Sequence, residues 1–308
     1  MTTISAKVIA DSVNDAGNRL TTMMLRYPRV IHAEFMTHRQ FSRNASSSRA
    51  IPVERLIKDI IDDPFIPLHW GKNQRGMQAH KECNNPITLP LPEEVLQRMD
   101  PYELSKVHEA LYGKPALTRE EAWSYALARA IQTALAFNEA GYHKQLVNRL
   151  VEPFAHINVL VTATEWSNFF ALRLHEDAEP HINLLAFEMK KALDESKPTQ
   201  LRGGSWHLPF ITDSDFALLY KEDSWERLKQ ISVARCARVS YLTHDGREPN
   251  FDEDKALHDR LMSAVPLHAS PAEHVCTPYS VIHTPEMQAN LRGWVSYRKY
   301  FANECAGA

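Results

Sequence analysis

Thr37–Arg49 reads THRQFSRNASSSR and is the most informative stretch of the chain. It holds three arginines, one histidine and four serines. Guanidinium groups, hydroxyls and free backbone N–H groups are the donors with which proteins bind phosphate. Apolar residues at helical spacing precede it, so we expect a helix that ends at His38 and Arg39, with the serines in the loop that follows. The composition predicts an anion site, and a solvated surface loop is the alternative.

A second informative stretch, Leu267–His274, reads LHASPAEH. Ser270 followed by proline and then Glu273 has the spacing of a helix N-cap with a capping box. Capping explains Ser270 and Glu273 without any function. It does not explain His268 and His274 on either side.

Together these stretches resemble the signatures of the flavin-dependent thymidylate synthases. The family's Arg-His-Arg, seven variable residues and serine fit Thr37–Arg39 and Ser47, and its His-x-(Ser/Thr)-Pro-x-Glu-His fits His268–His274. Ala234–Tyr241 is similar to the family's Ala-Arg-Val-Ser segment. Thr164–Arg173 is similar to its Asn-x-x-x-Leu-Arg helix.

The order of these motifs differs from the family's, because the two that usually come first stand last here. A circular permutation explains this order, and such a rearrangement is tolerated when chain termini lie close together at the surface. We therefore expect residues 230–280 to pack against residues 28–50. Phe35–Phe41 also matches Trp294–Tyr300 in character at each position, which indicates a possible internal duplication.

The resemblance implies roles for individual residues. Arg173 would contact both the pyrimidine and the flavin, where a fixed cation stabilises negative charge on a ring; an interhelical salt bridge is the alternative for Arg149 and Arg173. The implied catalytic residues are Arg173, Ser47 and His268. The implied cofactor-binding residues are His38, Arg39, Ser42, Asn168, Arg173, Ser240, His268, Ser270 and Glu273, and the implied substrate-binding residues are Ser46, Ser47, Ser48, Arg49, Arg149 and Arg173.

Four positions depart from the family pattern. Thr37 replaces the first arginine of the motif, Glu34 stands where glutamine is frequent, and Ala45 and Ala50 replace a glutamate and a tyrosine. The loss of an arginine makes the pocket less positive. The sequence therefore predicts either an altered substrate or compensation by another cation, for which the candidates are Arg43, Arg298 and Lys299.

The activity that the resemblance implies is the reductive methylation of dUMP to dTMP, with methylenetetrahydrofolate as carbon donor, NADPH as reductant and FAD as cofactor. The alternatives are hydroxymethylation or the use of dCMP, and, from another class, a flavin- or nucleotide-binding protein without catalysis. The sequence contains no GxGxxG stretch, so it does not indicate a dinucleotide-binding domain of the Rossmann type.

Composition limits the other possibilities. The chain has 308 residues, 44% of them hydrophobic, and a net charge of −3, so we expect a large core and no nucleic-acid partner. The absence of a long apolar run predicts no membrane span, and the four dispersed cysteines predict a cytoplasmic protein without disulfides. We expect no catalytic cysteine, with Cys236 buried in a helix. His69, His80 and Cys83 have no fourth ligand at a recognisable spacing, so we expect no metal.

The predicted fold is α+β, a mixed or antiparallel sheet packed with helices, assembled as a homotetramer like the family. The motifs fall into parts 1–200 and 201–308, expected to form one intertwined domain with a linker over 197–214. We expect strands over 7–11, 19–27, 156–162 and 275–283, a turn at Asn14–Gly17, a long loop over 63–90, and helices over 53–61, 92–99, 102–112, 119–140, 146–151, 166–174, 179–193, 225–239, 251–264 and 286–301.

Overall fold

The computed structural model describes residues 3–89, 100, 102, 103, 105, 106, 109, 113, 116–218, 224–239 and 250–304. The chain divides into two compact units. The helical unit is formed by Val53–Ala155, and the sheet unit by Thr3–Pro52 and His156–Ala308. Both of the sequence parts that meet at residue 200 contribute to the sheet unit.

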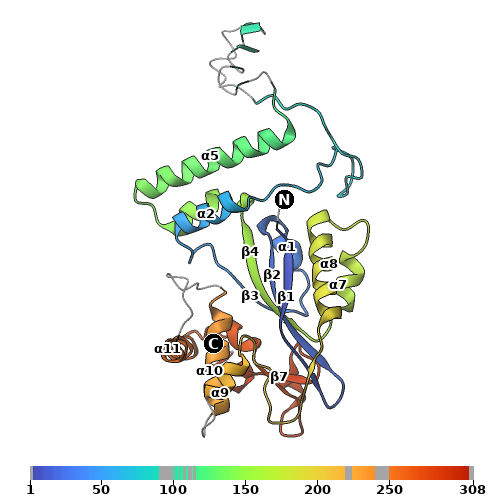
Figure 1. Ribbon diagram of the computed structural model, residues 1–308, viewed down its shortest axis with the longest axis vertical. Helices are drawn as coiled ribbons and strands as arrows, with labels where there is room; N and C mark the ends of the chain where they lie inside the picture. Colours follow the sequence, from blue (N-terminus) through green and yellow to red (C-terminus); the bar gives the residue numbers. More distant parts are fainter. Residues whose placement is uncertain are drawn as a thin grey trace. The chain divides into compact units, whose positions relative to one another are not determined.

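The sheet unit contains a five-stranded mixed sheet with strand order β3-β4-β2-β1-β5 (Figure 1). The short β5 pairs parallel with β1, and the other pairs are antiparallel. Helices pack on the sheet, and the predicted α+β class is confirmed. The strands are β1 (Ser5–Asn14), β2 (Arg19–Pro28), β3 (Ser42–Ala45), β4 (His156–Ala163) and β5 (Thr199–Leu201).

The hairpin of β1 and β2 forms as the sequence predicts. The side-chain oxygen of Asn14 accepts hydrogen bonds from the backbone N–H groups of Ala16 and Asn18 and so closes the turn. Gly17 supplies the positive φ of +77° that this turn requires. β2 and β4 are the central strands, and residues on both of their faces are buried.

Each face of the sheet has its own apolar core. On one face, Met23, Leu25 and Tyr27 pack with residues of α7 (Ser167–Arg173) and α8 (Pro180–Glu195). On the other face, Leu160 contacts Cys236, and Leu20 contacts Trp294. The alternation of side chains along a strand explains why neighbours in sequence belong to different cores.

The layer on this second face is made of short elements from the C-terminal part. It contains α10 (Ser224–Ala237) packed on α11 (Phe251–Met262), the 3₁₀ turn η4 (Ser270–Glu273), and a two-stranded antiparallel sheet of β6 (Cys276–Pro278) and β7 (Trp294–Ser296). The short α9 (Asp213–Leu218) precedes α10.

The predicted linker over 197–214 is wrong. β5 lies within it, and the buried His207 exchanges backbone hydrogen bonds with Cys276. This segment joins the strands of the large sheet to the second layer, so its glycines and prolines mark turns between paired residues.

The predicted last helix over 286–301 is also wrong. The chain forms a 3₁₀ turn η5 (Pro285–Gln288), then β7, then a 3₁₀ turn η6 (Tyr297–Tyr300). Gly293 has a φ of +78°, and a Cβ there would lie 2.4 Å from the Asn18 amide. Phe35–Phe41 is a helix end and turn, so the resemblance between the two stretches has no counterpart in secondary structure.

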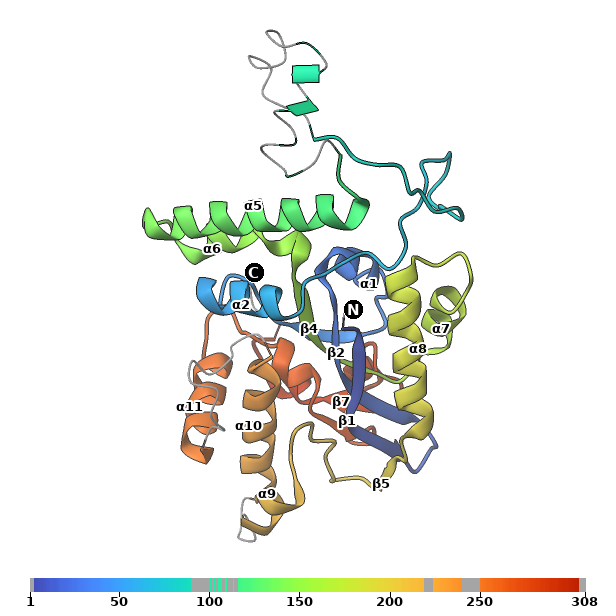
Figure 2. The ribbon, with the colours of Figure 1, turned by 45° about the horizontal axis from the view of Figure 1, so that its top comes forward.

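The helical unit contains the predicted α2 (Val53–Asp62) and α5 (Arg119–Glu139), followed by the short α6 (Lys144–Val147) and the 3₁₀ turns η2 (Asn148–Leu150) and η3 (Glu152–Phe154) (Figure 2). Thr118 and Glu121 form a complete capping box at the start of α5. The described part of the predicted loop, 63–89, contains no helix or paired strand beyond isolated bridges. The helix expected over 92–99 lies outside the described residues, and that over 102–112 lies largely outside them.

Among the described residues, no helix is both long and apolar enough to cross a membrane. Within the same residues, no three or more histidine, cysteine or acidic side chains gather as they would to hold a metal ion.

Candidate functional site

The central contact of the candidate site joins Arg173, at the end of α7, to His38. Nε of Arg173 donates to Nε2 of His38 at 3.0 Å, although 135 positions separate them. Burial, reinforced by the positive charges of Arg173 and Arg43, lowers the pKa of His38 to about 4. The imidazole is therefore neutral at physiological pH, with its proton on Nδ1, since Nε2 accepts the hydrogen bond.

Aromatic rings hold His38 in place. Its ring stacks on Phe41 and meets the edge of Phe169, with ring centroids 5.9 and 4.8 Å apart. Phe41 in turn packs on Trp166 at 4.8 Å. Phe169 and Trp166 come from the start of the Asn-x-x-x-Leu-Arg stretch, so the apolar residues of this motif position the imidazole that Arg173 contacts.

Two of the departures from the family pattern, Glu34 and Thr37, both contact Arg173. Nη1 of the arginine lies 3.4 Å from Oε2 of Glu34, and Nη2 lies 3.5 Å from Oγ1 of Thr37. The Thr37 hydroxyl itself donates to the Glu34 carbonyl at 2.7 Å. An acidic and a neutral side chain thus stand beside the arginine. The salt bridge left open for Arg173 is present, with Glu34 of α1 (His32–Phe35) as partner.

The helix that leads to this site is shorter than predicted. It consists of the 3₁₀ turn η1 (Arg29–Ile31) and α1, so it ends before His38. Nη1 of Arg43 donates to the backbone carbonyls of Met36 and His38 at 3.0 and 3.1 Å. The same nitrogen lies 3.4 Å from the carbonyl oxygen of Phe35. Nη1 of Arg43 therefore satisfies carbonyls at the end of the helix, which fixes the position of this guanidinium.

The serines after His38 do not form one loop. Ser42 begins β3, where its hydroxyl accepts from the Asn290 amide at 3.1 Å. Ser46 makes two contacts with Asn158: its N–H donates to the Asn158 carbonyl at 2.8 Å, and its hydroxyl accepts from the Asn158 N–H at 3.1 Å. Ser48 is buried. The hydroxyl of Ser42 is thus engaged by a side chain and that of Ser46 by the backbone, which leaves less of their hydrogen-bonding capacity for a ligand.

Ser47 and Arg49 are more accessible than their neighbours. Oγ of Ser47 accepts from the backbone N–H of Arg49 at 3.3 Å, which forms a local turn. Arg49 is exposed, as are Arg39 and Asn168. A ligand can therefore reach these two arginines and this asparagine without any rearrangement of the motif segments.

Residues 230–280 pack against residues 28–50, as the permuted order predicts. The side-chain amide of Asn44 on β3 donates to the carbonyl of Cys236 on α10 at 2.7 Å. β3 also contacts η4. Burial lowers the pKa of Arg43, and the negative charge of Glu273 partly offsets this lowering.

The predicted capping box at Ser270 is wrong. Ser270 is the first residue of η4, which has no side-chain cap among the described residues. Glu273 instead forms an ion pair with Arg298, and Lys299 pairs with Glu304 at 2.9 Å. Both cations that were candidates for compensation near the C-terminus are therefore paired. Ser270 and His268 are exposed.

The arginines of the Ala-Arg-Val-Ser stretch stabilise the second layer. Arg235 pairs with Asp215 at 2.8 Å, and Arg238 pairs with the fully buried Asp254 at 2.6 Å. Cys236, between them, is fully buried, and burial raises the pKa of its thiol. Ser240 lies outside the described residues. Arg149 is exposed in the helical unit, in η2.

Sequence reasoning missed a chain of buried hydrogen bonds on the second face of the sheet. It runs from Ser12 to Nδ1 of His207 (2.8 Å), from Nε2 of His207 to Thr22 (2.8 Å), from Thr22 to Thr162 (2.6 Å), and from Thr162 to Nδ1 of His274 (2.7 Å). Threonines at matching positions of two apolar strands were the available signal. Burial lowers the pKa of His207 to about 4 and that of His274 to about 3.

The far end of this chain is Nε2 of His274. The ring is fully buried, and no partner for Nε2 lies within hydrogen-bond distance in the described part of the protein. A buried polar atom without a partner is uncommon in a native structure. His274 is the last residue of the LHASPAEH stretch, so the polar chain connects this motif to the strands of the sheet.

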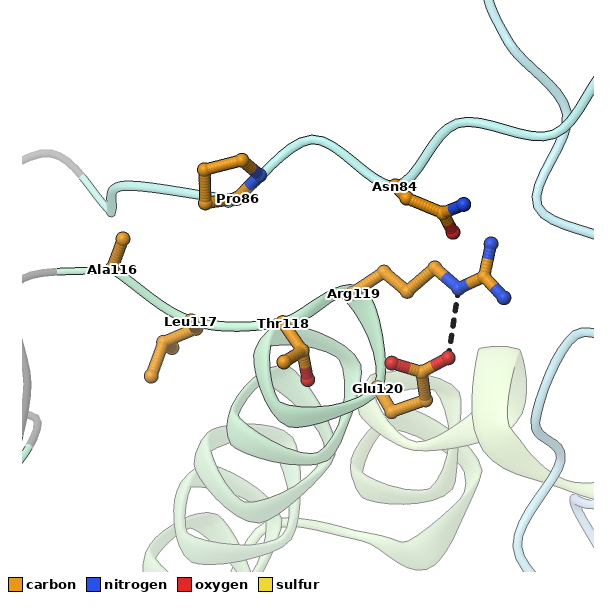
Figure 3. Close-up of a pocket in the computed structure, with 7 residues that line it drawn as sticks. All are labelled: Asn84, Pro86, Ala116, Leu117, Thr118, Arg119 and Glu120. Carbon is orange, nitrogen blue, oxygen red and sulfur yellow. Dashed lines mark hydrogen bonds and ion pairs between the residues drawn. The ribbon is translucent and has the colours of Figure 1, made fainter.

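Figure 3 shows a separate pocket in the helical unit. Asn84, Pro86 and residues 116–120 line it, and Arg119 within it pairs with Glu120 at 2.7 Å. None of the residues implied by the family motifs lines this pocket, and it is not the candidate site.

No family model matches the sequence, and no curated protein is significantly similar to it in sequence. Among solved structures, the chain is similar to the UMP/dUMP methylase PolB from Streptomyces cacaoi bound with 5-Br UMP, with 13% identity over 63% of this chain and 91% of that chain and a TM-score of 0.42. The same enzyme bound with 5-Br dUMP is similar at 12% identity and a TM-score of 0.41, over the same shares of both chains.

Proposed function

We propose that the protein is a flavin-dependent enzyme that methylates a pyrimidine nucleotide. The proposed substrate is dUMP, with methylenetetrahydrofolate as carbon donor and NADPH as reductant. The hydrogen bond between Arg173 and His38 carries this proposal, because it joins the two motif stretches that would bind flavin and nucleotide. The contact of Asn44 with Cys236 brings a third motif stretch to the same unit.

The exposed polar residues of three motif stretches fit a flavin cofactor by their chemistry. Arg39, Asn168, Ser270 and His268 are exposed and polar, so they can donate hydrogen bonds to an anionic or carbonyl-bearing ligand without first breaking buried contacts. FAD, when bound, would supply the redox chemistry, and the protein would supply binding, orientation and electrostatics. We propose that these residues hold FAD in a homotetramer with shared sites.

For the nucleotide, we propose that Arg49 and Ser47 bind the phosphate. Both belong to the serine-rich stretch, and Arg49 is an exposed cation. A guanidinium binds phosphate through two parallel hydrogen bonds, which fix its orientation as well as its position. Arg173, whose Nε is held by His38, would donate to the base with its two terminal nitrogens.

A second candidate is the modification of another pyrimidine nucleotide, either by hydroxymethylation or with dCMP as the substrate. Glu34 and Thr37 favour it, since both replace family residues and both contact Arg173. A change of charge beside Arg173 alters which hydrogen-bond donors and acceptors a bound pyrimidine base must carry. A flavin- or nucleotide-binding protein without catalysis is the alternative from another class.

One experiment separates these possibilities. The purified protein is examined for the visible absorbance of flavin, then incubated with FAD, NADPH, methylenetetrahydrofolate and either dUMP or dCMP, and the product is identified by mass. We expect bound flavin and a gain of one methyl group on dUMP. A hydroxymethyl product, or a product from dCMP alone, selects the second candidate. Flavin binding without any product selects the non-catalytic alternative, and neither binding nor product contradicts the proposal.

A further inference from the structure

We propose that Glu34 and Arg173 form an acceptor and donor pair that binds the hydrogen-bonding edge of the pyrimidine base. In this arrangement Arg173 is not a phosphate site, and Glu34 determines which base edge is accepted. The inference rests on the proposed function and extends it to a residue in which this chain departs from the family pattern.

The bonds of Arg173 differ in quality. Its Nε bond to His38 is 3.0 Å long, within the usual range, whereas its two terminal nitrogens lie 3.4 Å from Glu34 and 3.5 Å from Thr37. The guanidinium is thus anchored through Nε, whereas its two terminal nitrogens make only weak contacts. Those two nitrogens can exchange their present partners for a ligand at little cost, while the bond of Nε to His38 keeps the plane of the guanidinium fixed.

Both partners are accessible to a ligand. The side chain of Arg173 is 19% exposed and that of Glu34 is 45% exposed. An ion pair with a half-exposed partner contributes little to stability. Exchanging this ion pair for contacts with a ligand would therefore cost the protein little stability.

The charges at this point disfavour phosphate. The carboxylate of Glu34 offsets the guanidinium of Arg173, so an incoming phosphate would meet a like charge as well as an opposite one. The hydroxyl proton of Thr37 is directed to the Glu34 carbonyl, so Thr37 presents lone pairs and not a donor.

A neutral ligand that presents an acceptor beside an N–H group satisfies both members of the pair. Arg173 has only donors, and an ionised carboxylate has only acceptors. Uracil offers a carbonyl next to N3–H, and cytosine offers N3 next to the amino group at C4. The shared chemistry is an acceptor adjacent to an N–H donor on the edge of a pyrimidine.

The test compares each nucleotide with an analogue that lacks the N–H group. Calorimetry measures the dissociation constants of dUMP, 3-methyl-dUMP, dCMP and N4,N4-dimethyl-dCMP for the full-length protein with FAD added. The variants are Glu34→Gln, which keeps an accepting oxygen, and Glu34→Met, which removes it at similar length. Glu176→Gln, an exposed glutamate beyond α7, is the control for the loss of one negative charge.

We expect the wild type to bind the unmethylated nucleotide about tenfold or more tightly than its methylated analogue, the range for a hydrogen bond to a charged group. In Glu34→Met the ratio should fall below about threefold, with Glu34→Gln in between and Glu176→Gln as in the wild type. An unchanged ratio in Glu34→Met would show that a steric clash or another residue reads the base, and would overturn this inference alone. A wild type that binds none of the nucleotides would overturn the proposed function together with it.

Discussion

The imidazole of His38 accepts a hydrogen bond at Nε2 from Nε of Arg173, which ties the protonation state of the histidine to the position of the arginine. A protonated His38 could not accept this bond. Arg173 is also the nearby positive charge that contributes most, after burial, to the lowered pKa of His38.

Replacing Arg173 by methionine should raise the pKa of His38 from about 4 toward the ordinary value of 6.5, because a repelling charge is removed and water gains access. NMR titration of the histidine signals measures this shift without any ligand. Arg292→Met, which removes an exposed arginine, is the control and should leave the His38 titration unchanged. An unaltered pKa in the Arg173 variant would contradict the contact.

The same arginine should be shared by flavin and nucleotide if the proposed function holds. Arg173→Ala should weaken the binding of FAD and of dUMP, each by about tenfold or more, because a charge-assisted hydrogen bond is lost from both. Calorimetric titration with each ligand measures the effect. Binding of both ligands at wild-type affinity would contradict the assignment of Arg173.

Thr162→Val should reduce the free energy of unfolding by about 1–3 kcal/mol, because the isosteric valine removes the hydrogen-bond partner of the buried Nδ1 of His274 and leaves the Thr22 hydroxyl with His207 alone. Urea denaturation measures the loss. Thr199→Val, an exposed position on β5 of the same sheet, is the matched control and should have little effect. A loss no larger than that of the control would show that the chain of hydrogen bonds does not stabilise the protein.

Acid should destabilise the protein through His207 and His274. Their pKa values in the folded state, about 4 and about 3, lie below the ordinary value of 6.5, so the unfolded chain takes up protons first as the pH falls. Above pH 6.5 these two neutral histidines cost the protein no stability. Below that pH the free energy of unfolding falls progressively, because protonation favours the unfolded chain. Between pH 7 and pH 5 each of the two histidines lowers the free energy of unfolding by about 2 kcal/mol.

Replacing one of the two should flatten this pH dependence. His274→Gln should lose part of the slope of unfolding free energy against pH between 7 and 5, whereas His80→Gln, which removes an exposed histidine, should keep it. An equal slope in wild type and His274→Gln would mean that His274 is already protonated in the folded protein.

The cysteine thiols provide a further test of mechanism. Cys236 and Cys276 are fully buried, and burial raises the pKa of both, so neither should react with a thiol reagent until the protein unfolds, whereas the partly exposed Cys83 should react in the folded protein. Under the proposed function, Cys236→Ala should keep turnover within about tenfold of wild type, since the flavin and not a thiolate drives the reaction. Abolished turnover with FAD and nucleotide still bound would contradict this.

The sequence predicted local structure well wherever one strong signal acted alone. The hairpin before residue 29, α2, α5 and β4 follow from turn residues, capping residues and apolar periodicity. It failed where distant contacts decide the outcome: Trp294–Ser296 reads as helix by periodicity, yet it pairs with Cys276–Pro278 and forms β7. A short strand in a C-terminal segment has no local signature.

The candidate site shows the same division. The resemblance to the family correctly implied that Arg173 and His38 come together, and the permuted motif order correctly implied that residues 230–280 lie on residues 28–50. Spacing could not reveal that Ser42 and Ser46 are engaged by Asn290 and Asn158, or that Glu273 pairs with Arg298. These partners lie more than 20 positions away, and nothing in the local pattern marks them.

The place of β4 in the sheet has a consequence for how the chain folds during synthesis. β3 pairs only with β4 in this sheet, and β4 begins at His156, more than 100 residues after β3 ends. The segment with His38 and the serines must therefore wait without a strand partner until the ribosome has released residues 156–163. Closing so long a loop is slow compared with forming the β1–β2 hairpin, so this segment should be among the last parts of the nascent protein to become resistant to protease.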